Sequence, residues 1–560
     1  NEHPEYKDQI ISGGMATCFG CTISGPVPVK DVMKVAEGLM ERGAERLNVA
    51  DTVGYANPKQ VRDLFTELYR TVGKDVPVGA HFHDTRGLGL ANVFAALDAG
   101  VREFDSCLGG LGGCPYAPGA SGNIVTEDLV FMLEAQGMKT GVDLDGLLQA
   151  REIMERQLKG EPVHGTYTAE LSIPLEVDYP EIREQVAKVC ADFPGEYWHK
   201  LEDQPPSGSY PTEFIEALTA SGYLAALIPE EYGGAGLPVR GGAVILETIN
   251  VTGCSASPGH AQMYTMGTIL RHGSKEQKDY YLPKIASGEL RLQAFGVTEP
   301  TTGSDTTQLK TRADKQGNGY VINGQKVWTS RAAHSDLMLL LARTTPADKV
   351  EKRTDGISTF LIDLKEAQKH GCEIRPIDAM VNHNTCEVFF DNVPIPGDSL
   401  IGEEGKGFKY ILDGMNAERC LTASEAIGNG RYFIEKAVGY ANERIVFKRP
   451  IGQNQGIQFP IAKAYADIEA ADLMVRKATA MFDAGLPCGS EANMARLLSA
   501  QSAWDAGEAC FTTHGGFAFA REYHIERKWR EARLARTAPI SPNLILSYLA
   551  QHVLGLPRSY

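Results

Sequence analysis

The hydrophobic pattern changes its period along the chain and divides the chain into regions of different predicted structure. Residues 178–181 predict a helix start of the capping-box type. Apolar residues at helical spacing follow this start: Ile182, Val186 and Val189. Ser274 with Gln277 predicts a second start of the same kind. We therefore expect a helical domain over residues 175–290.

The pattern then changes to short runs of strand type. These runs are Tyr320–Ile322, Leu337–Leu341, Thr359–Ile362 and Val388–Phe390. Turns between strands are predicted at Gly317-Asn318-Gly319 and at Asn323-Gly324. After Gly405 helical spacing resumes and continues through Val553. We expect a β-domain over residues 291–400 and a helical bundle over residues 401–560.

The first part of the chain has a different pattern of predicted elements. Candidate strands alternate with helical stretches at intervals of roughly thirty residues, as in βα units. The strands are predicted at Leu47–Ala50, Val76–Ala80 and Arg102–Asp105, and polar side chains follow their ends at Asp51, Thr52, His83, Asp84 and Cys107. βα barrels carry their chemistry at these strand ends. His81 and His83 stand at i and i+2, so both imidazoles face one side of a strand and can reach one cation, although such a pair alone is more often structural.

Composition limits the class of protein. The chain has 560 residues, 43% of them hydrophobic, and a formal net charge of −16. No apolar run is long enough to span a membrane, and no signal pattern is visible, so we expect no membrane insertion and a cytoplasmic or mitochondrial matrix location. The negative charge disfavours nucleic acid as a partner. The 11 cysteines show no metal-binding spacing, which predicts reduced thiols.

Two segments of the predicted β-domain indicate a flavin site. Gly296–Asp305 is a loop rich in Gly, Ser and Thr, where backbone N–H groups can approach an anion or a ring edge. Lys326–Ser330 adds an indole and two hydroxyls on a strand. An isoalloxazine ring needs a flat apolar wall and donors to its heteroatoms. Alone, the first segment is equally typical of an ordinary loop, and the second is equally typical of a strand with a buried Trp.

Together and at this spacing, the two segments resemble the signature of the acyl-CoA dehydrogenase family. The resemblance covers roughly Asp178 to Tyr560 and includes the order of helical domain, central β-domain and helical bundle. It implies FAD as the cofactor. The residues that match flavin-lining positions are Phe295, Val297, Thr298, Gly303, Ser304, Trp328 and Ser330.

The resemblance also implies contacts to CoA and between subunits. Ser304 matches a position that meets the CoA moiety, and Arg419 is expected to contact CoA or to brace its helix. Arg444 and Gln455 match positions that reach the adenine and pyrophosphate of FAD from a neighbouring subunit, and Gly515 and Gly516 match a phosphate-side loop. A homodimer or homotetramer follows from this resemblance.

The catalytic base of this family is a carboxylate that removes the α-proton of the acyl thioester. Most members carry it in a Tyr-Glu-Gly-Thr-like stretch, where this chain has Ala538-Pro539-Ile540-Ser541. Other members carry it in a Glu-Arg step on an earlier helix, which matches Glu418-Arg419. Glu418 is the candidate base, against the alternative of a surface helix residue paired with a cation. Pro539 has no N–H to polarise the thioester, so either the loop is shifted by a residue or other donors do this.

The resemblance predicts an FAD-dependent acyl-CoA dehydrogenase that forms a 2-enoyl-CoA and passes electrons to an electron-transferring flavoprotein. Two alternatives stay open. The first is an acyl-CoA oxidase-like flavoenzyme that uses oxygen. The second is a non-catalytic assembly protein that binds CoA or flavin.

Residues 13–158 resemble part of a hydroxymethylglutaryl-CoA lyase. The match rests on the segments 109–116 and 119–123, followed by Glu127 as a site carboxylate. It implies His81, His83 and Asn123 as ligands of Mg²⁺ or Mn²⁺ and places Cys114 in the catalytic cysteine loop.

The Arg-Asp pair that completes this site in the family is missing, and only about 165 residues are present where a closed barrel takes about 250. We therefore expect a half-barrel over residues 1–158, a linker over 159–174, a vestigial or incomplete metal site and no lyase activity from this chain alone. Asn1 is not an initiator Met, which indicates a fragment, an artificial join or a natural fusion.

Overall fold

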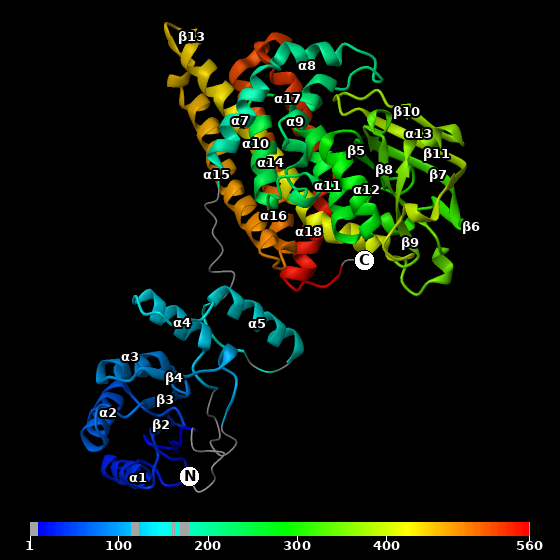
Figure 1. The fold of residues 1–560 in the computed structure, drawn as a ribbon. Helices are drawn as coiled ribbons and strands as arrows, with labels where there is room; N and C mark the ends of the chain where they lie inside the picture. Colours follow the sequence, from blue (N-terminus) through cyan, green and yellow to red (C-terminus); the bar gives the residue numbers. More distant parts are fainter. Residues whose placement is uncertain (1–8, 114–121, 159–160, 162, 168–177, 559–560) are drawn as a thin grey trace. The chain divides into compact units, whose positions relative to one another are not determined.

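The computed structural model describes residues 9–113, 122–158, 161, 163–167 and 178–558 (Figure 1). The chain forms two compact units, Asn1–Ile173 and Pro174–Tyr560, here called the smaller and the larger unit. Most of the predicted linker lies outside the described residues.

The smaller unit is built on a parallel sheet, as the alternation of predicted strands and helices indicates. Its strands β1 (Ser12–Met15), β2 (Arg46–Asp51), β3 (Val78–Phe82) and β4 (Glu103–Asp105) lie in the order β1-β2-β3-β4. The helices are α1 (Val29–Glu41), α2 (Pro58–Val72), α3 (Gly89–Ala99), α4 (Thr126–Ala135) and α5 (Leu144–Gln157). Leu47 and Val49 of β2 are buried in the core with Phe65 of α2. Among the described residues the sheet has two open edges and does not close into a barrel.

The larger unit begins with helices, as predicted. They are α7 (Pro180–Ala191), α8 (Gly195–Glu202), α9 (Thr212–Ala220), α10 (Val239–Val251), α11 (Ser257–His272) and α12 (Lys275–Ser287). Ser274 and Gln277 form the predicted capping box of α12. The capping box predicted at residues 178–181 is wrong: no side chain caps α7. The Asp178 carboxylate accepts hydrogen bonds from Arg183 instead, at 2.7 and 3.1 Å.

An eight-stranded sheet follows. Its strands are β5 (Leu292–Gly296), β6 (Arg312–Gln316), β7 (Gly319–Ser330), β8 (Leu337–Arg343), β9 (Ile357–Asp363), β10 (Cys372–Pro376), β11 (Thr385–Ile395) and β12 (Leu400–Ile401). The order is β10-β11-β7-β6-β8-β9-β12, with β5 parallel to β8, and the short helix α13 (Leu364–Lys369) follows β9. All four predicted strand runs lie within these strands.

The turn predicted at Asn323-Gly324 is wrong, because both residues lie inside β7. Asn323 pairs with Arg312 of β6 and Gly324 with Phe390 of β11. The chain reverses at Gly317, which has a φ of +56°. A Cβ at Gly324 would lie 2.5 Å from the Thr311 hydroxyl oxygen, so this glycine permits a close approach rather than a turn.

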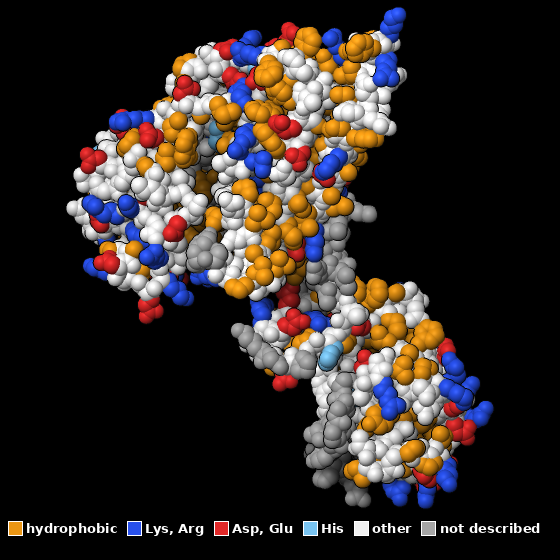
Figure 2. All heavy atoms as spheres, turned by 180° about the vertical axis from the view of Figure 1, so that it is seen from behind, with side chains coloured by type: hydrophobic (Ala, Val, Ile, Leu, Met, Phe, Trp, Pro, Cys, Tyr) orange, Lys and Arg blue, Asp and Glu red, His pale blue; other side chains and the backbone are white. Residues whose placement is uncertain are grey.

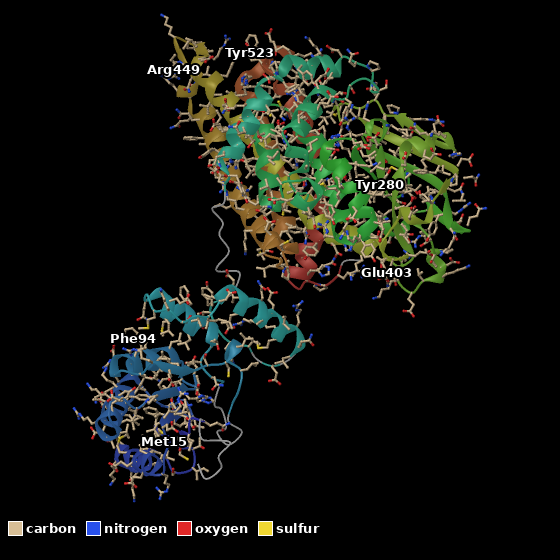
Figure 3. All side chains as sticks on the ribbon, in the orientation of Figure 1. Met15, Phe94, Tyr280, Glu403, Arg449 and Tyr523 are labelled. Atoms are coloured by element: carbon tan, nitrogen blue, oxygen red, sulfur yellow. The ribbon has the colours of Figure 1, made fainter. Side chains whose placement is uncertain are left out.

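The helical bundle follows the sheet. It consists of α14 (Gly407–Glu443), α15 (Gln455–Asp483), α16 (Gly489–His514), α17 (Ile525–Ala535) and α18 (Pro542–Tyr548), with a small hairpin of β13 (Ile445–Val446) and β14 (Arg449–Pro450) between α14 and α15. The 37-residue helix α14 packs against α16, α10, α15 and α11. Arg449 on the hairpin and Glu403 after β12 lie at opposite ends of the larger unit (Figure 3).

Candidate active site

Glu418 lies on the buried face of α14 and is 6% exposed. Burial raises the pKa of its carboxyl to about 7, although the nearby guanidinium groups of Arg419 and Arg496 act in the opposite direction. No described side chain donates a hydrogen bond to this carboxylate. The structure therefore places the candidate base in the interior, with oxygens available to a proton donor, rather than on the helix surface.

Two arginines frame Glu418. Arg419 donates a hydrogen bond from Nη1 to Asn416 Oδ1 at 2.9 Å, and its Nε has no partner in the described chain. Arg496 of α16 is buried and donates to the backbone carbonyls of Ala535 and Ala538. Arg496 thus ties the segment that precedes Pro539 to the helix beside the candidate base.

Glu531, the acidic residue nearest in sequence to Pro539, is already paired. It accepts a hydrogen bond from Arg527 at 2.9 Å and one from Lys528 at 2.7 Å. Burial alone would raise the pKa of Glu531, but the two cations outweigh burial and lower it. A carboxylate held in this way is a poor proton acceptor, so the geometry favours Glu418.

The two segments that indicate a flavin site lie side by side. Val327 N–H donates to Thr298 O at 2.9 Å, and the Lys326 ammonium donates to Val297 O at 3.1 Å. Lys326 also forms an ion pair with Glu299 at 2.9 Å. These contacts join the loop after β5 to the end of β7, as the combined signature requires.

The predicted flavin-lining side chains surround this junction. The Trp328 indole is 59% exposed although its residue lies within a strand, and its backbone φ is +59°. Ser330 ends β7 opposite Thr385 of β11. Gly303 and Ser304 are exposed, and a Cβ added to Gly303 would meet no atom within 4 Å. An exposed indole face beside an open glycine loop fits a flat ring system.

Phe295 lies on the interior side of this junction. It is half-buried on β5, and its ring centroid is 5.6 Å from that of Tyr264 on α11. Phe295 therefore connects the sheet to α11, which packs against the helix α14 that carries Glu418.

The residues predicted to reach FAD from a neighbouring subunit, and those of the predicted phosphate-side loop, lie elsewhere. Arg444 and Gln455 flank the hairpin, and Gly515 and Gly516 follow α16. The Arg444 guanidinium lies 5.7 Å from the Phe517 ring centroid, so these segments meet. The hairpin and the β-domain lie on opposite sides of the larger unit (Figure 1). One chain therefore does not bring the two sets of residues together.

In the smaller unit the two histidines face each other as predicted. Their Nε2 atoms are 3.2 Å apart, and His83 forms a β-bridge with Asn123. The Asn123 amide donates to Cys107 Sγ at 2.9 Å and to Leu111 O at 3.0 Å. The Asp105 carboxylate lies 3.4 Å from His81 Nδ1, and the buried Asn123 Oδ1 has no hydrogen-bond partner among the described residues. No group of three His, Cys, Asp or Glu ligands in the described chain includes the two histidines, and the incomplete metal site stays a prediction. Cys114 lies outside the described residues.

Glu127 has a structural position rather than the predicted site position. It is fully buried and forms an ion pair with Arg151 at 2.9 Å. It also accepts the Gly109 N–H at 3.1 Å. Glu127 therefore holds the glycine-rich loop in place.

A cluster of interior polar residues was not predicted from the sequence. They are His260 and Tyr264 on α11, Arg331 after β7, His383 before β11 and Glu425 on α14. Only the i, i+7 spacing of Glu418 and Glu425 signals that two carboxylates share one face of a helix.

Comparison with known proteins establishes the family. Residues 178–289, 294–393 and 405–539 match the acyl-CoA dehydrogenase N-terminal, middle and C-terminal domains, and residues 6–154 match the family described as HMGL-like. The acyl-CoA dehydrogenase fadE12 of Mycobacterium bovis is 32% identical over 386 residues, which is 68% of this chain and 98% of that protein. The chain belongs to the acyl-CoA dehydrogenase family and carries an HMGL-like segment before it.

Two further relatives differ in their acyl groups. Cyclohex-1-ene-1-carbonyl-CoA dehydrogenase of Syntrophus aciditrophicus is 34% identical over 59% of this chain and 79% of that protein. The structure of butyryl-CoA dehydrogenase from Megasphaera elsdenii is similar with a TM-score of 0.62, at 25% identity, over 68% of this chain and all of that chain.

The described helices include none with the length and apolar character needed to cross a membrane.

Proposed function

We propose that the larger unit is an FAD-dependent dehydrogenase that oxidises the Cα–Cβ bond of an acyl-CoA, with Glu418 as the base. The supporting observation is the state of Glu418, which is buried, has a pKa raised to about 7 and lacks a described hydrogen-bond donor. A base with a pKa near the working pH combines the correct protonation state with sufficient basicity. Bound FAD would supply the acceptor for the β-hydride.

The residues around Trp328 would hold the isoalloxazine, and the hairpin side of a second copy would hold the rest of FAD. The exposed apolar residues there support a homodimer or homotetramer. They include Phe447, which is 94% exposed, with Phe459, Tyr465 and Leu473 of α15. Figure 2 shows apolar side chains gathered over the helical bundle. A second copy would cover this surface and complete the cofactor site.

The family supports an electron-transferring flavoprotein as the acceptor, with molecular oxygen as the alternative. A non-catalytic assembly protein is disfavoured, because it would not need an unpaired buried carboxylate at the position of the base. The acyl groups of the relatives differ, so the relatives do not assign one acyl group to this chain.

The proposal predicts a yellow protein with about one FAD per chain, whose flavin absorbance bleaches when an acyl-CoA is added without oxygen. A panel of straight, branched and carboxylated acyl-CoAs tests this in an anaerobic cuvette. Reoxidation by an electron-transferring flavoprotein, compared with reoxidation by air, then separates a dehydrogenase from an oxidase. Colourless protein that does not take up FAD would contradict the proposal.

The smaller unit is expected to lack lyase activity. Its described sheet is open, and no three-ligand group of His, Cys, Asp or Glu in the described chain includes the two histidines, so hydroxymethylglutaryl-CoA with added Mg²⁺ or Mn²⁺ should not be cleaved. A coupled assay for acetoacetate checks this, with His81→Ala as the matched variant. Metal-dependent turnover that disappears in His81→Ala would show that the open sheet suffices.

A further inference from the structure

Arg331 is a buried cation without an anionic partner. It follows Ser330 at the end of β7, is 2% exposed, and is held by a hydrogen bond from its N–H to Asn384 O at 2.7 Å. The side-chain contact of its guanidinium is to His383 Nδ1, 3.4 Å from Nη2. Its Nε has no hydrogen-bond partner, and no carboxylate of the described chain lies within 4.0 Å of its nitrogens.

Burial favours the neutral form of each titratable group that faces Arg331. Burial, with Arg331 next, lowers the pKa of His260 to about 3 and holds that of His383 well below its ordinary value. Burial raises the pKa values of Tyr210 and Tyr264. Burial also raises the pKa of Glu425 to about 8, although Arg331 and Lys528 oppose it. Glu425 is the carboxyl among these groups; it lies 3.6 Å from His260 Nδ1 and forms no ion pair with Arg331 within 4.0 Å.

The other charges nearby are already engaged. Arg496, which also interacts with His260 and Glu425, donates to the carbonyls of Ala535 and Ala538. Lys528 is paired with Glu531 at 2.7 Å. Neither Arg331 nor Arg496 has a carboxylate within 4.0 Å among the described residues, but the Arg496 guanidinium is held by two carbonyls, whereas that of Arg331 contacts only His383. Arg331 is therefore the cation of this cluster with the fewest polar partners.

A buried guanidinium without a counter-ion is costly, because it has lost water and gained no paired charge. The planar fork of arginine matches a carboxylate, to which it can donate two parallel hydrogen bonds. A carboxylate from a ligand would supply the missing charge and partner the free Nε. An apolar acyl chain would leave the guanidinium without a counter-ion and its Nε without a hydrogen-bond partner.

The need of Arg331 for a carboxylate partner relates to the position of Glu418 through Glu425 and Tyr264. Glu418 and Glu425 are seven residues apart on α14, which places them on one face about 10 Å apart along the axis. Tyr264 on α11 interacts electrostatically with Glu418, Arg331 and Glu425. Tyr264 thus lies within electrostatic range of both Glu418 and the cluster around Arg331.

We propose that Arg331 binds a carboxylate at the far end of the acyl chain, so that the substrates are CoA monothioesters of dicarboxylic acids. This inference rests on the proposed dehydrogenase function and makes Arg331 a specificity-determining residue. His383 and the Glu425 carboxyl flank the bound carboxylate. The thioester end of the same chain lies at Glu418.

The test compares acyl-CoAs of matched length with and without a terminal carboxylate in anaerobic flavin reduction. Glutaryl-, adipyl- and suberyl-CoA are paired with pentanoyl-, hexanoyl- and octanoyl-CoA. For the best pair we expect kcat/KM to favour the carboxylated substrate by about 10²-fold or more, since losing one partner of a buried charged pair has effects of this size. Equal or faster reduction by the unsubstituted acyl-CoAs would overturn the inference and leave the dehydrogenase function standing.

Variants test whether the preference for carboxylated acyl-CoAs comes from Arg331. Arg331→Met should reduce the carboxylate preference at least tenfold, mainly through KM, and Arg331→Lys should retain part of it because the charge remains without the fork. Arg240→Met is the matched control: Arg240 is also buried but pairs with Asp178 at 3.5 Å, so its loss should alter stability and not the preference.

FAD content and reduction by the unsubstituted acyl-CoA show that each variant is folded. A preference that survives in folded Arg331→Met would exclude Arg331 as its origin. If no acyl-CoA of either kind reduces the wild-type flavin, the proposed function itself fails, which is a different result from a lost preference.

Discussion

Replacing Glu418 by glutamine is expected to slow anaerobic flavin reduction by acyl-CoA by about 10²–10⁴-fold. Glutamine has nearly the same shape but cannot accept the α-proton. Because the carboxylate receives no described hydrogen bond, its loss leaves no donor unsatisfied, and the fold and FAD content should be unchanged. The effect should appear in the rate constant for reduction, while the spectral shift on acyl-CoA binding persists.

Stopped-flow measurement of flavin absorbance checks this prediction. The matched control is Glu435→Gln on the exposed face of the same helix, where neutralisation should change the rate little. Near-normal reduction in Glu418→Gln would remove Glu418 from the mechanism. It would move the search to Glu425, the other carboxyl of this region with a raised pKa.

The pH dependence of the same rate gives an independent check. The pKa of Glu418 is raised to about 7, and only the deprotonated form accepts a proton. Reduction by the wild type should therefore fall as the pH decreases through about 7 and reach a plateau above it. The residual rate of Glu418→Gln should lack this transition, because the group that titrates is gone.

Motifs in the sequence predict the base and the flavin loop, but not their surroundings. The Glu-Arg step identifies Glu418, since the chemistry needs a carboxylate and Pro539 cannot provide one. The cluster of Arg331, His260 and Glu425 has no sequence signal, because its members come from separate elements, β7, α11 and α14. Their burial and pKa shifts arise only when these elements pack together.

The wrong predictions have similar causes. Asn-Gly favours a hairpin turn locally, but pairing of Asn323 with Arg312 and of Gly324 with Phe390 extends β7 through it. The Asp178 carboxylate is engaged by Arg183, and α7 begins without a side-chain cap. Strand β1 was not predicted because Ser12–Met15 contains two glycines and one large apolar residue. Strand pairing thus overrides the local turn preference at Asn323-Gly324, whereas the other two cases depend on local side-chain engagement and on composition.

The second large effect is expected at Lys326, which joins the two halves of the candidate flavin site. Its side chain is 0% exposed, and its ammonium lies 2.9 Å from Glu299 Oε1 and 3.1 Å from Val297 O. The Glu299 carboxylate also accepts the N–H groups of Lys310 and Thr311, at 2.6 and 2.9 Å. Glu299 therefore fixes the loop after β5 only while its charge is compensated.

Lys326→Met should leave this carboxylate buried and unpaired, which costs about 3–5 kcal/mol. The expected results are a lower unfolding midpoint of the larger unit and a loss of FAD, because the loop no longer lies against Trp328. The double variant Glu299→Gln with Lys326→Met should recover part of the stability, since no buried charge then remains. Lys275→Met, which breaks the exposed pair with Asp279, is the control and should cost less than about 1 kcal/mol. Thermal unfolding followed by flavin fluorescence measures the unfolding midpoint and the FAD content. A Lys326→Met protein that is as stable and as rich in FAD as the control would show that the ion pair does not hold the loop.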